Sequence, residues 1–124
     1  MQHLNTITEQ ILKHSFRVHT ELGPGLLKSS YKECLYYELG QNGLFVEKEK
    51  ALPLIYKDVK LDIGYRVDLL VEKQIIVEIK AVEALNDIHT AQVLTYLKLS
   101  GCKIGLLMNF HTTHLKGGIK RLIL

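Results

Sequence analysis

The fold is decided by two neighbouring runs of sequence, Tyr65-Arg66-Val67-Asp68-Leu69-Leu70-Val71 and Ile75-Ile76-Val77-Glu78-Ile79-Lys80-Ala81. Both runs are rich in β-branched and aliphatic residues, and the polar Glu72-Lys73-Gln74 joins them. Such a pair of runs around a short polar connection is typical of an antiparallel hairpin. We therefore expect the rest of the chain to pack around this hairpin.

Symmetry about the turn predicts which side chains meet across the hairpin. A turn centred on Lys73 places Asp68 opposite Glu78, and it places Arg66 opposite Lys80. A slip of one residue in the pairing would move Asp68 to the other face. On the same face as these charges, Leu70 and Ile76 lie nearer the turn. The other face consists of Val67, Leu69, Val71, Ile75, Val77 and Ile79. Because this second face is wholly apolar, we expect it to belong to the core.

Two opposed carboxylates need a neighbour that compensates their charge. Directly opposed residues lie ~5 Å apart at their Cβ atoms, and like charges at that distance repel. A divalent cation between Asp68 and Glu78, with Lys80 beside it, would remove the repulsion. The alternative is a solvated cluster of ion pairs in which Arg66 and Lys80 neutralise the carboxylates. The hairpin alone favours the ion pairs, because most surface charge clusters are of this weak kind.

An Asp followed on the next strand by Glu-x-Lys resembles the signature of the PD-(D/E)XK nuclease superfamily. Further blocks are similar to its small "GxxExxY" branch and follow one another in the family's order. They are residues 22–27 (LGPGLL) with Ser30-Tyr31, residues 62–68 (DIGYRVD), residues 77–85 (VEIKAVEAL) and residues 89–97 (HTAQVLTYL). Because the resemblance covers nearly the whole chain, it favours the metal site over the ion-pair cluster.

The resemblance implies both a fold and an activity. The fold is α/β (α+β) and restriction-endonuclease-like, with a central mixed β-sheet flanked by helices. The activity is that of a metal-dependent nuclease acting on phosphodiester bonds of DNA or RNA, with Asp68, Glu78 and Lys80 as catalytic residues. Asp68, Glu78 and the Ile79 carbonyl are the expected metal ligands. Such hard oxygen ligands favour Mg²⁺ or Mn²⁺ over zinc.

One position departs from the pattern of the branch. The motif reads Gly25-Leu26-Leu27-Lys28-Ser29-Ser30-Tyr31, so Lys28 stands where the branch has its Glu. A protonated lysine cannot ligate a metal. In the first turn of a helix its charge also opposes the helix macrodipole. We therefore expect weak or undetectable cleavage by this sequence.

A helix over about residues 87–100 would carry the remaining candidates, with Asn86 or Asp87 as its cap. On this helix His89, Gln92 and Tyr96 share one face. The Gln and Tyr, four residues apart, resemble the Q-x-x-x-Y element of RecB-like members of the superfamily. The expected substrate-binding residues are Gln92, Tyr96, Arg66 and His89. The alternative for this face is the polar edge of a packed helix.

The other elements follow from apolar spacing and from turn residues. We expect helices over about 6–22 and from 28–30 to 39, with a capping box at Thr6-Ile7-Thr8-Glu9 and a solvated face that carries Lys13, His14 and Arg17. Further strands are expected at 44–49, 52–56, 59–63, 104–110 and 118–124. A helix between the hairpin and residues 104–110 implies one crossover in a mixed sheet.

The totals describe an ordinary globular chain. Its 124 residues, 47% hydrophobic and 23% charged, predict a single domain over residues 1–124. A net charge of +3 permits a nucleic-acid partner. No apolar run is long enough to span a bilayer, the N-terminus lacks a signal peptide, and Cys34 and Cys102 fit no metal or redox spacing. We therefore expect a cytoplasmic protein with no membrane partner, and the oligomeric state stays open, a homodimer included.

The sequence is compatible with three classes of function. The first is a metal-dependent nuclease. The second is a catalytically inactive nucleic-acid-binding relative, in which Lys28 displaces a ligand. The third is a protein-interaction module that keeps the fold and uses the charged cluster as a salt-bridge network. Metal binding separates the first class from the others, and salt-dependent polyanion binding separates the second from the third.

Overall fold

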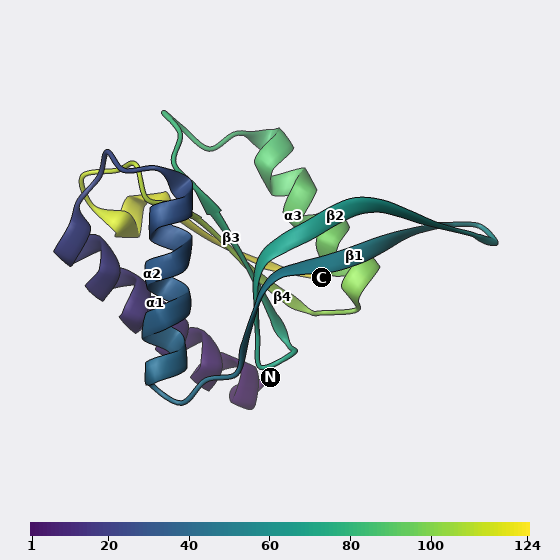
Figure 1. Cartoon of the computed structure of the whole chain (residues 1–124), viewed down its shortest axis with the longest axis horizontal. Coiled ribbons are helices and arrows are strands. Elements are labelled where there is room, and N and C mark those ends of the chain that lie inside the picture. Colours follow the sequence, from purple (N-terminus) through teal and green to yellow (C-terminus); the bar gives the residue numbers. More distant parts are fainter.

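The expected hairpin forms in the computed structural model, which describes residues 1–124, as strands β2 (Val59–Val71) and β3 (Ile75–Lys80). The other elements are α1 (Gln2–Leu22), α2 (Lys28–Gln41), β1 (Val46–Tyr56), α3 (Asp87–Ser100), β4 (Ile104–Asn109), the short 3₁₀ helix η1 (Leu115–Gly118) and β5 (Ile119–Ile123). The sheet has the order β1-β2-β3-β4-β5. Only β3 and β4 are parallel, and α3 connects them. The predicted mixed sheet with one crossover is confirmed (Figure 1).

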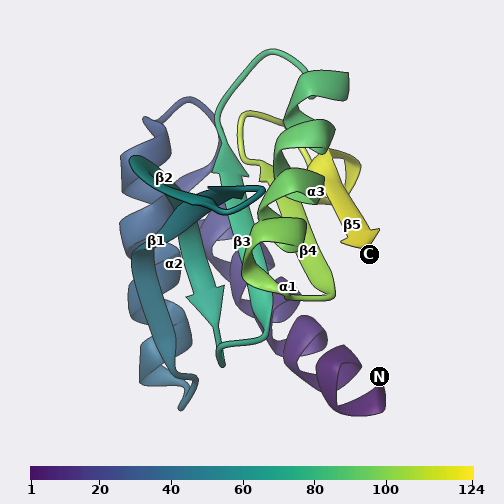
Figure 2. The ribbon, with the colours of Figure 1, turned by 90° about the vertical axis from the view of Figure 1, so that its right-hand side faces the viewer.

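Helices cover both faces of this sheet, so the protein has two apolar cores. Figure 2 shows α2 and α3 on opposite sides of the strands. Leu69, Val71 and Val77 pack with α1 and α2 in the larger core. Leu70 and Ile76 are buried with α3 in the smaller one. α3 therefore covers the hairpin face near the turn, where the sequence places Leu70 and Ile76.

The strands β2 and β3 stay paired only near the turn. Their ladder joins Leu69 to Val77, Leu70 to Ile76 and Val71 to Ile75, which is the register predicted from a turn centred on Lys73. β2 is paired with β1 along its whole length, so beyond Leu69 β1 is its only neighbour in the sheet.

Two pairing expectations fail at this separation. Arg66 lies opposite Ala51 of β1, so the expected pairing of Arg66 with Lys80 was wrong. Val67 packs in the smaller core together with Leu70, not with Leu69 and Val71. The alternation of β2 is therefore interrupted at Asp68, where the strand leaves β3.

Beyond this separation, β1 and β2 project from the body as a two-stranded ribbon (Figure 1). We call its outer part, residues 53–64, the arm. The strands predicted at 44–49 and 52–56 are one continuous strand, and those predicted at 59–63 and 65–71 are another. Pro53 and Gly64 do not interrupt these strands. They lie at a shift of register between Leu52 and Leu54, where a missing N–H and a positive φ are tolerated.

The first helix differs from its expected form in two places. It begins at Gln2, so Thr6 does not cap it, and the Thr6 hydroxyl donates to the Gln2 carbonyl inside the helix. His14, expected on a solvated face, is 1% exposed. It is buried because α2 packs against that side of α1. None of the helices has the length and apolar character needed to cross a membrane.

Candidate active site

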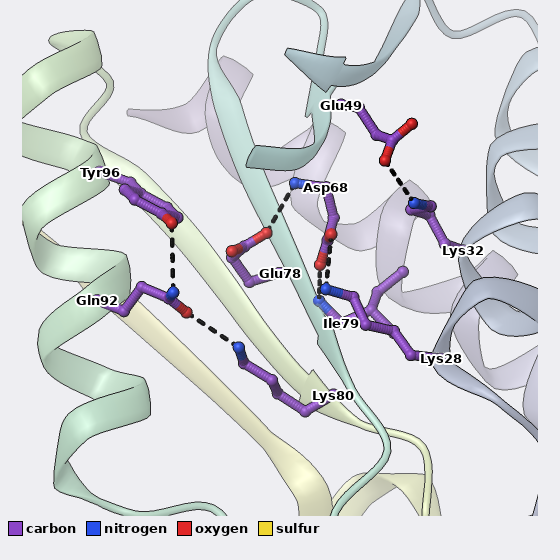
Figure 3. Close-up of polar contacts among 9 residues, drawn as sticks. All are labelled: Lys28, Lys32, Glu49, Asp68, Glu78, Ile79, Lys80, Gln92 and Tyr96. Carbon is purple, nitrogen blue, oxygen red and sulfur yellow. Dashed lines mark hydrogen bonds and ion pairs between the residues drawn. The ribbon is translucent and has the colours of Figure 1, made fainter. Parts of the chain in front are cut away.

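Side chains replace the backbone ladder at the point where β2 and β3 separate. The Asp68 N–H donates to Glu78 Oε2 at 2.7 Å, and the Ile79 N–H donates to Asp68 Oδ2 at 2.8 Å. Each carboxylate thus accepts a hydrogen bond from the opposite strand (Figure 3). Asp68 is 7% exposed and Glu78 is 3% exposed. Both carboxylates are thus buried, contrary to the solvated cluster that the hairpin alone favours, because helices cover both faces there.

Burial changes how this pair carries its charge. Removal from water, followed by the negative charge of Asp68, raises the pKa of Glu78 to about 8. At neutral pH Glu78 therefore holds a proton, and the two carboxyl groups share about one negative charge. The repulsion that the hairpin sequence implies is relieved in part by this proton.

Lys28, in the first turn of α2, also reduces the repulsion between the two carboxylates. Its Nζ lies 2.9 Å from Asp68 Oδ1. One turn later, Lys32 Nζ lies 3.1 Å from Glu49 on β1. Arg66 makes no ion pair and is exposed, so the alternative cluster of Arg66 and Lys80 with both carboxylates is not formed. The cation beside Asp68 is the residue that departs from the branch motif.

The loop before α2 fixes the position of Lys28, and Tyr31 fixes the loop. The Tyr31 hydroxyl donates to the Gly23 carbonyl at 2.6 Å and accepts from the Leu26 N–H at 3.1 Å. Its ring is fully buried and stacks on Phe110 with centroids 4.8 Å apart. The sequence identifies Tyr31 only as part of the branch motif and assigns its hydroxyl no partner. A tyrosine hydroxyl near a Gly-Pro-Gly turn is the signal that could have indicated a partner.

On the other side of the pair, α3 contributes a chain of polar contacts. Lys80 Nζ donates to Gln92 Oε1 at 3.0 Å, and Gln92 Nε2 donates to the Tyr96 hydroxyl at 3.2 Å. Burial, and then the charge of Glu78, raises the pKa of Tyr96. Tyr96 therefore stays protonated and lies within electrostatic reach of the carboxylates. The shared helical face of Gln92 and Tyr96 is thus present next to Lys80 (Figure 3).

The other two substrate-binding candidates are placed differently. His89 Nδ1 accepts from the Asn86 N–H at 3.1 Å, while Asn86 Oδ1 accepts from the N–H groups of Ile88 and His89. This reciprocal capping box uses one His89 nitrogen to start α3. Arg66 lies on β2 beyond its separation from β3. No hydrogen bond or ion pair links either side chain to the carboxylate pair.

The oxygen donors suit a hard divalent cation, and there are few of them. No group of three or more His, Cys, Asp or Glu side chains is arranged to hold a metal ion. Asp68 and Glu78 supply carboxylate oxygens, and the Ile79 carbonyl belongs to the residue that already bonds Asp68. Mg²⁺ commonly binds through one or two carboxylates and retains water, so the donor set fits it. Such an ion would compete with the proton on Glu78 and the ammonium of Lys28.

A mixed sheet with an Asp on one hairpin strand, a Glu-x-Lys on the next and helices on both faces defines a restriction-endonuclease-like domain of the nuclease class. The family model of the PD-(D/E)XK nuclease superfamily matches residues 5–122, and the chain belongs to this superfamily. Comparisons with curated proteins and with solved structures find no match. Membership indicates a nuclease-type function, and nucleases of this superfamily generally depend on a divalent metal.

Proposed function

We propose that this chain, acting as one domain over residues 1–124, is a weak metal-dependent nuclease of the small GxxExxY branch. Its reaction is hydrolysis of phosphodiester bonds in DNA or RNA. The observation that carries the proposal is the buried pair of Asp68 and Glu78, bonded across the separating strands with Lys80 on the same strand as Glu78. Two adjacent buried carboxyl groups disfavour the folded state unless a proton or a cation compensates their charge.

Each residue of the site has a distinct task in this proposal. Asp68, Glu78 and the Ile79 carbonyl would hold a Mg²⁺ or Mn²⁺ ion, which when bound polarises the phosphodiester and acidifies an attacking water. The Lys80 ammonium orients that water or stabilises negative charge on the phosphate oxygens. Gln92 holds Lys80 in place through their 3.0 Å hydrogen bond. Gln92 and Tyr96 contact the substrate backbone, which positions the strand without reading its sequence.

Lys28 supports a second candidate function. Its 2.9 Å contact with Asp68 places a permanent cation where a metal would be needed. An inactive nucleic-acid-binding domain would use that charge for a phosphate. In that case oligonucleotide affinity falls steeply with salt while Mn²⁺ produces no binding heat. If the protein binds neither, a protein-interaction role on the same fold replaces both candidates.

Calorimetric titration with Mn²⁺ tests the primary function. We expect measurable heat with the natural protein and none with Asp68→Asn, which keeps the shape of the side chain but lacks the charge. Asp62→Asn, an exposed Asp on the arm, is the matched control and should bind like the natural protein. Because Mn²⁺ must displace the proton on Glu78, binding should release protons and tighten from pH 6 to 8.5. Equal heats for Asp68→Asn and the natural protein would refute the proposed site.

A further inference from the structure

A pocket of about 180 Å³ lies between the base of the arm and α3, beside the candidate active site. It is lined by Leu54, Tyr65, Gln92, Thr95, Tyr96 and Leu99. Leu54 and Tyr65 come from the two strands of the ribbon, and the other four come from α3. Tyr65 is 42% exposed, and it pairs across the ribbon with Leu52 of the smaller core. An aromatic ring therefore forms one wall of the pocket and remains open to a ligand.

The pocket and the candidate active site share side chains. Gln92 lines the pocket and accepts from Lys80 Nζ at 3.0 Å. Tyr96 also lines the pocket, and Figure 3 shows it beside Glu78. A phosphodiester placed at Glu78 and Lys80 would therefore have one of its neighbouring nucleosides at the mouth of the pocket.

The lining selects the uncharged part of a nucleotide. It contains no Lys, Arg, His, Asp or Glu, so nothing in it neutralises a phosphate. Two tyrosine rings and two leucines offer flat apolar contact, and aromatic side chains of this kind stack with bases of any sequence. The Tyr96 oxygen accepts from Gln92, so its own hydrogen remains to be donated. Together with the Thr95 hydroxyl, it suits the polar edge of a planar ring.

We propose that this pocket binds one unstacked nucleobase next to the scissile phosphate, with Tyr65 as its stacking platform. The substrate is then single-stranded or locally unpaired nucleic acid, because a base inside a duplex is stacked on both faces and must be extruded before it can enter. The inference rests on the proposed nuclease function and deepens it by naming the substrate class. It also assigns the base of the arm a role in binding.

The test compares binding of a single-stranded oligonucleotide and of the corresponding duplex, in chelator to prevent cleavage. The single strand carries 2-aminopurine, whose fluorescence is quenched by stacking. We expect quenching with the natural protein, an increase of about tenfold in the single-strand Kd for Tyr65→Leu, and an unchanged duplex Kd. Tyr65→Phe, which keeps the ring, should restore both quenching and affinity. Tyr37→Leu removes a tyrosine that is 63% exposed on α2, and it should change nothing.

A second variant guards against a general effect on folding. Thr95→Val removes only a hydroxyl from an exposed position on α3 and should weaken single-strand binding alone. If Tyr65→Leu binds the single strand like the natural protein, or weakens duplex binding equally, the base pocket is refuted while the nuclease proposal survives. If the natural protein binds neither oligonucleotide, the proposed function and the pocket fail together.

Discussion

At the scale of single residues, Lys28 has the greatest influence on the candidate site, because it places a cation beside Asp68. Its ammonium lies 2.9 Å from Asp68 Oδ1, and its side chain is 42% exposed. A pair this open to water is screened and contributes modest stability. At the proposed metal site we expect a stronger effect on metal binding, since the same oxygen of Asp68 cannot serve Lys28 and a metal ion equally well.

We expect Lys28→Glu to make stability depend on metal. Without metal, a third carboxylate near Asp68 and Glu78 should lower the melting temperature, although a Glu in the first turn of α2 recovers up to ~1 kcal/mol from the helix dipole. With Mn²⁺ the melting temperature should rise above that of the natural protein, and binding and cleavage of a DNA with single- and double-stranded parts should both increase. Calorimetry, thermal unfolding and a gel assay measure these effects.

Two further substitutions separate charge from ligation at this position. Lys28→Met removes the cation without adding an oxygen, so it should bind Mn²⁺ less tightly than Lys28→Glu. Lys32→Glu changes the same charge one turn along α2, where the partner is Glu49. It should leave metal affinity near that of the natural protein. If Lys28→Glu binds and cleaves no better than the natural protein, residue 28 lies outside the metal site.

The sequence predicts the placement of these residues only in part. Turn symmetry is sufficient to bring Asp68 and Glu78 together, because the side-chain period of two leaves little choice of register. Their burial is not predictable from the hairpin, since it depends on α2 and α3 covering the two faces. Only the resemblance of its motif connects Lys28 to the carboxylates, because 40 positions separate it from Asp68 in the chain.

At the scale of elements, the loop of residues 23–27 and the start of α2 depend on one buried hydroxyl. We expect Tyr31→Phe to keep the stacking on Phe110 but leave the Gly23 carbonyl and the Leu26 N–H without their partner. The cost should be about 1 kcal/mol of unfolding free energy, the usual net contribution of a hydrogen bond, because Gly23 and Leu26 are partly open to water. Urea unfolding measures it, with the exposed Tyr37→Phe as control. A cost no larger than that of Tyr37→Phe would show that the loop does not need the hydroxyl.

Element boundaries are predicted well where local signals are strong and poorly where tertiary contacts override them. Asn86 caps α3 through its side-chain oxygen, and Gly101 ends α3 in the left-handed conformation that glycine adopts readily. By contrast, Pro53 and Gly64 lie inside long strands. Breakers normally end strands, but a two-stranded ribbon accommodates them at a shift of register, which depends on both strands and is not visible in either alone.

At the scale of the whole molecule, the topology follows from a feature that the sequence displays directly. The run of residues 104–110 is apolar nearly throughout, as expected of a strand buried on both faces. Placed after a helix, it implies a parallel neighbour, and β4 does pair in parallel with β3. The presence of two separate cores does not follow from the hairpin, because its alternation suggests one solvated face.

Two buried groups in different parts of the molecule oppose each other in their response to pH. His14 lies between α1 and α2 with neither ring nitrogen hydrogen-bonded. Burial, and then the positive charges of Arg17 and Lys13, lowers its pKa from 6.5. The imidazole of His14 therefore binds a proton more readily in the unfolded chain than in the folded one. The contribution of His14 to folding stability is lost as pH falls below 6.5. Glu78 acts in the opposite direction, because its pKa is raised from 4.5 to about 8.

We expect stability to fall on the alkaline side of neutrality because of Glu78. Its contribution is complete below pH 4.5 and is lost as pH rises through about 8, since in this range the folded state keeps a proton that the unfolded state has already released. Between pH 6.5 and 8.5 the loss should be on the order of 2 kcal/mol, because each pKa unit corresponds to about 1.4 kcal/mol.

Glu78→Gln resembles the protonated side chain, so it should fold normally at neutral pH and show no such decline. Glu83→Gln, at an exposed position, should retain it. Urea unfolding across this pH range, in chelator to exclude metal, measures all three proteins. If the free energy of unfolding depends on pH in the same way for Glu78→Gln and the natural protein, Glu78 is already ionised in the folded state. Lys28 alone would then compensate the negative charge of the carboxylate pair.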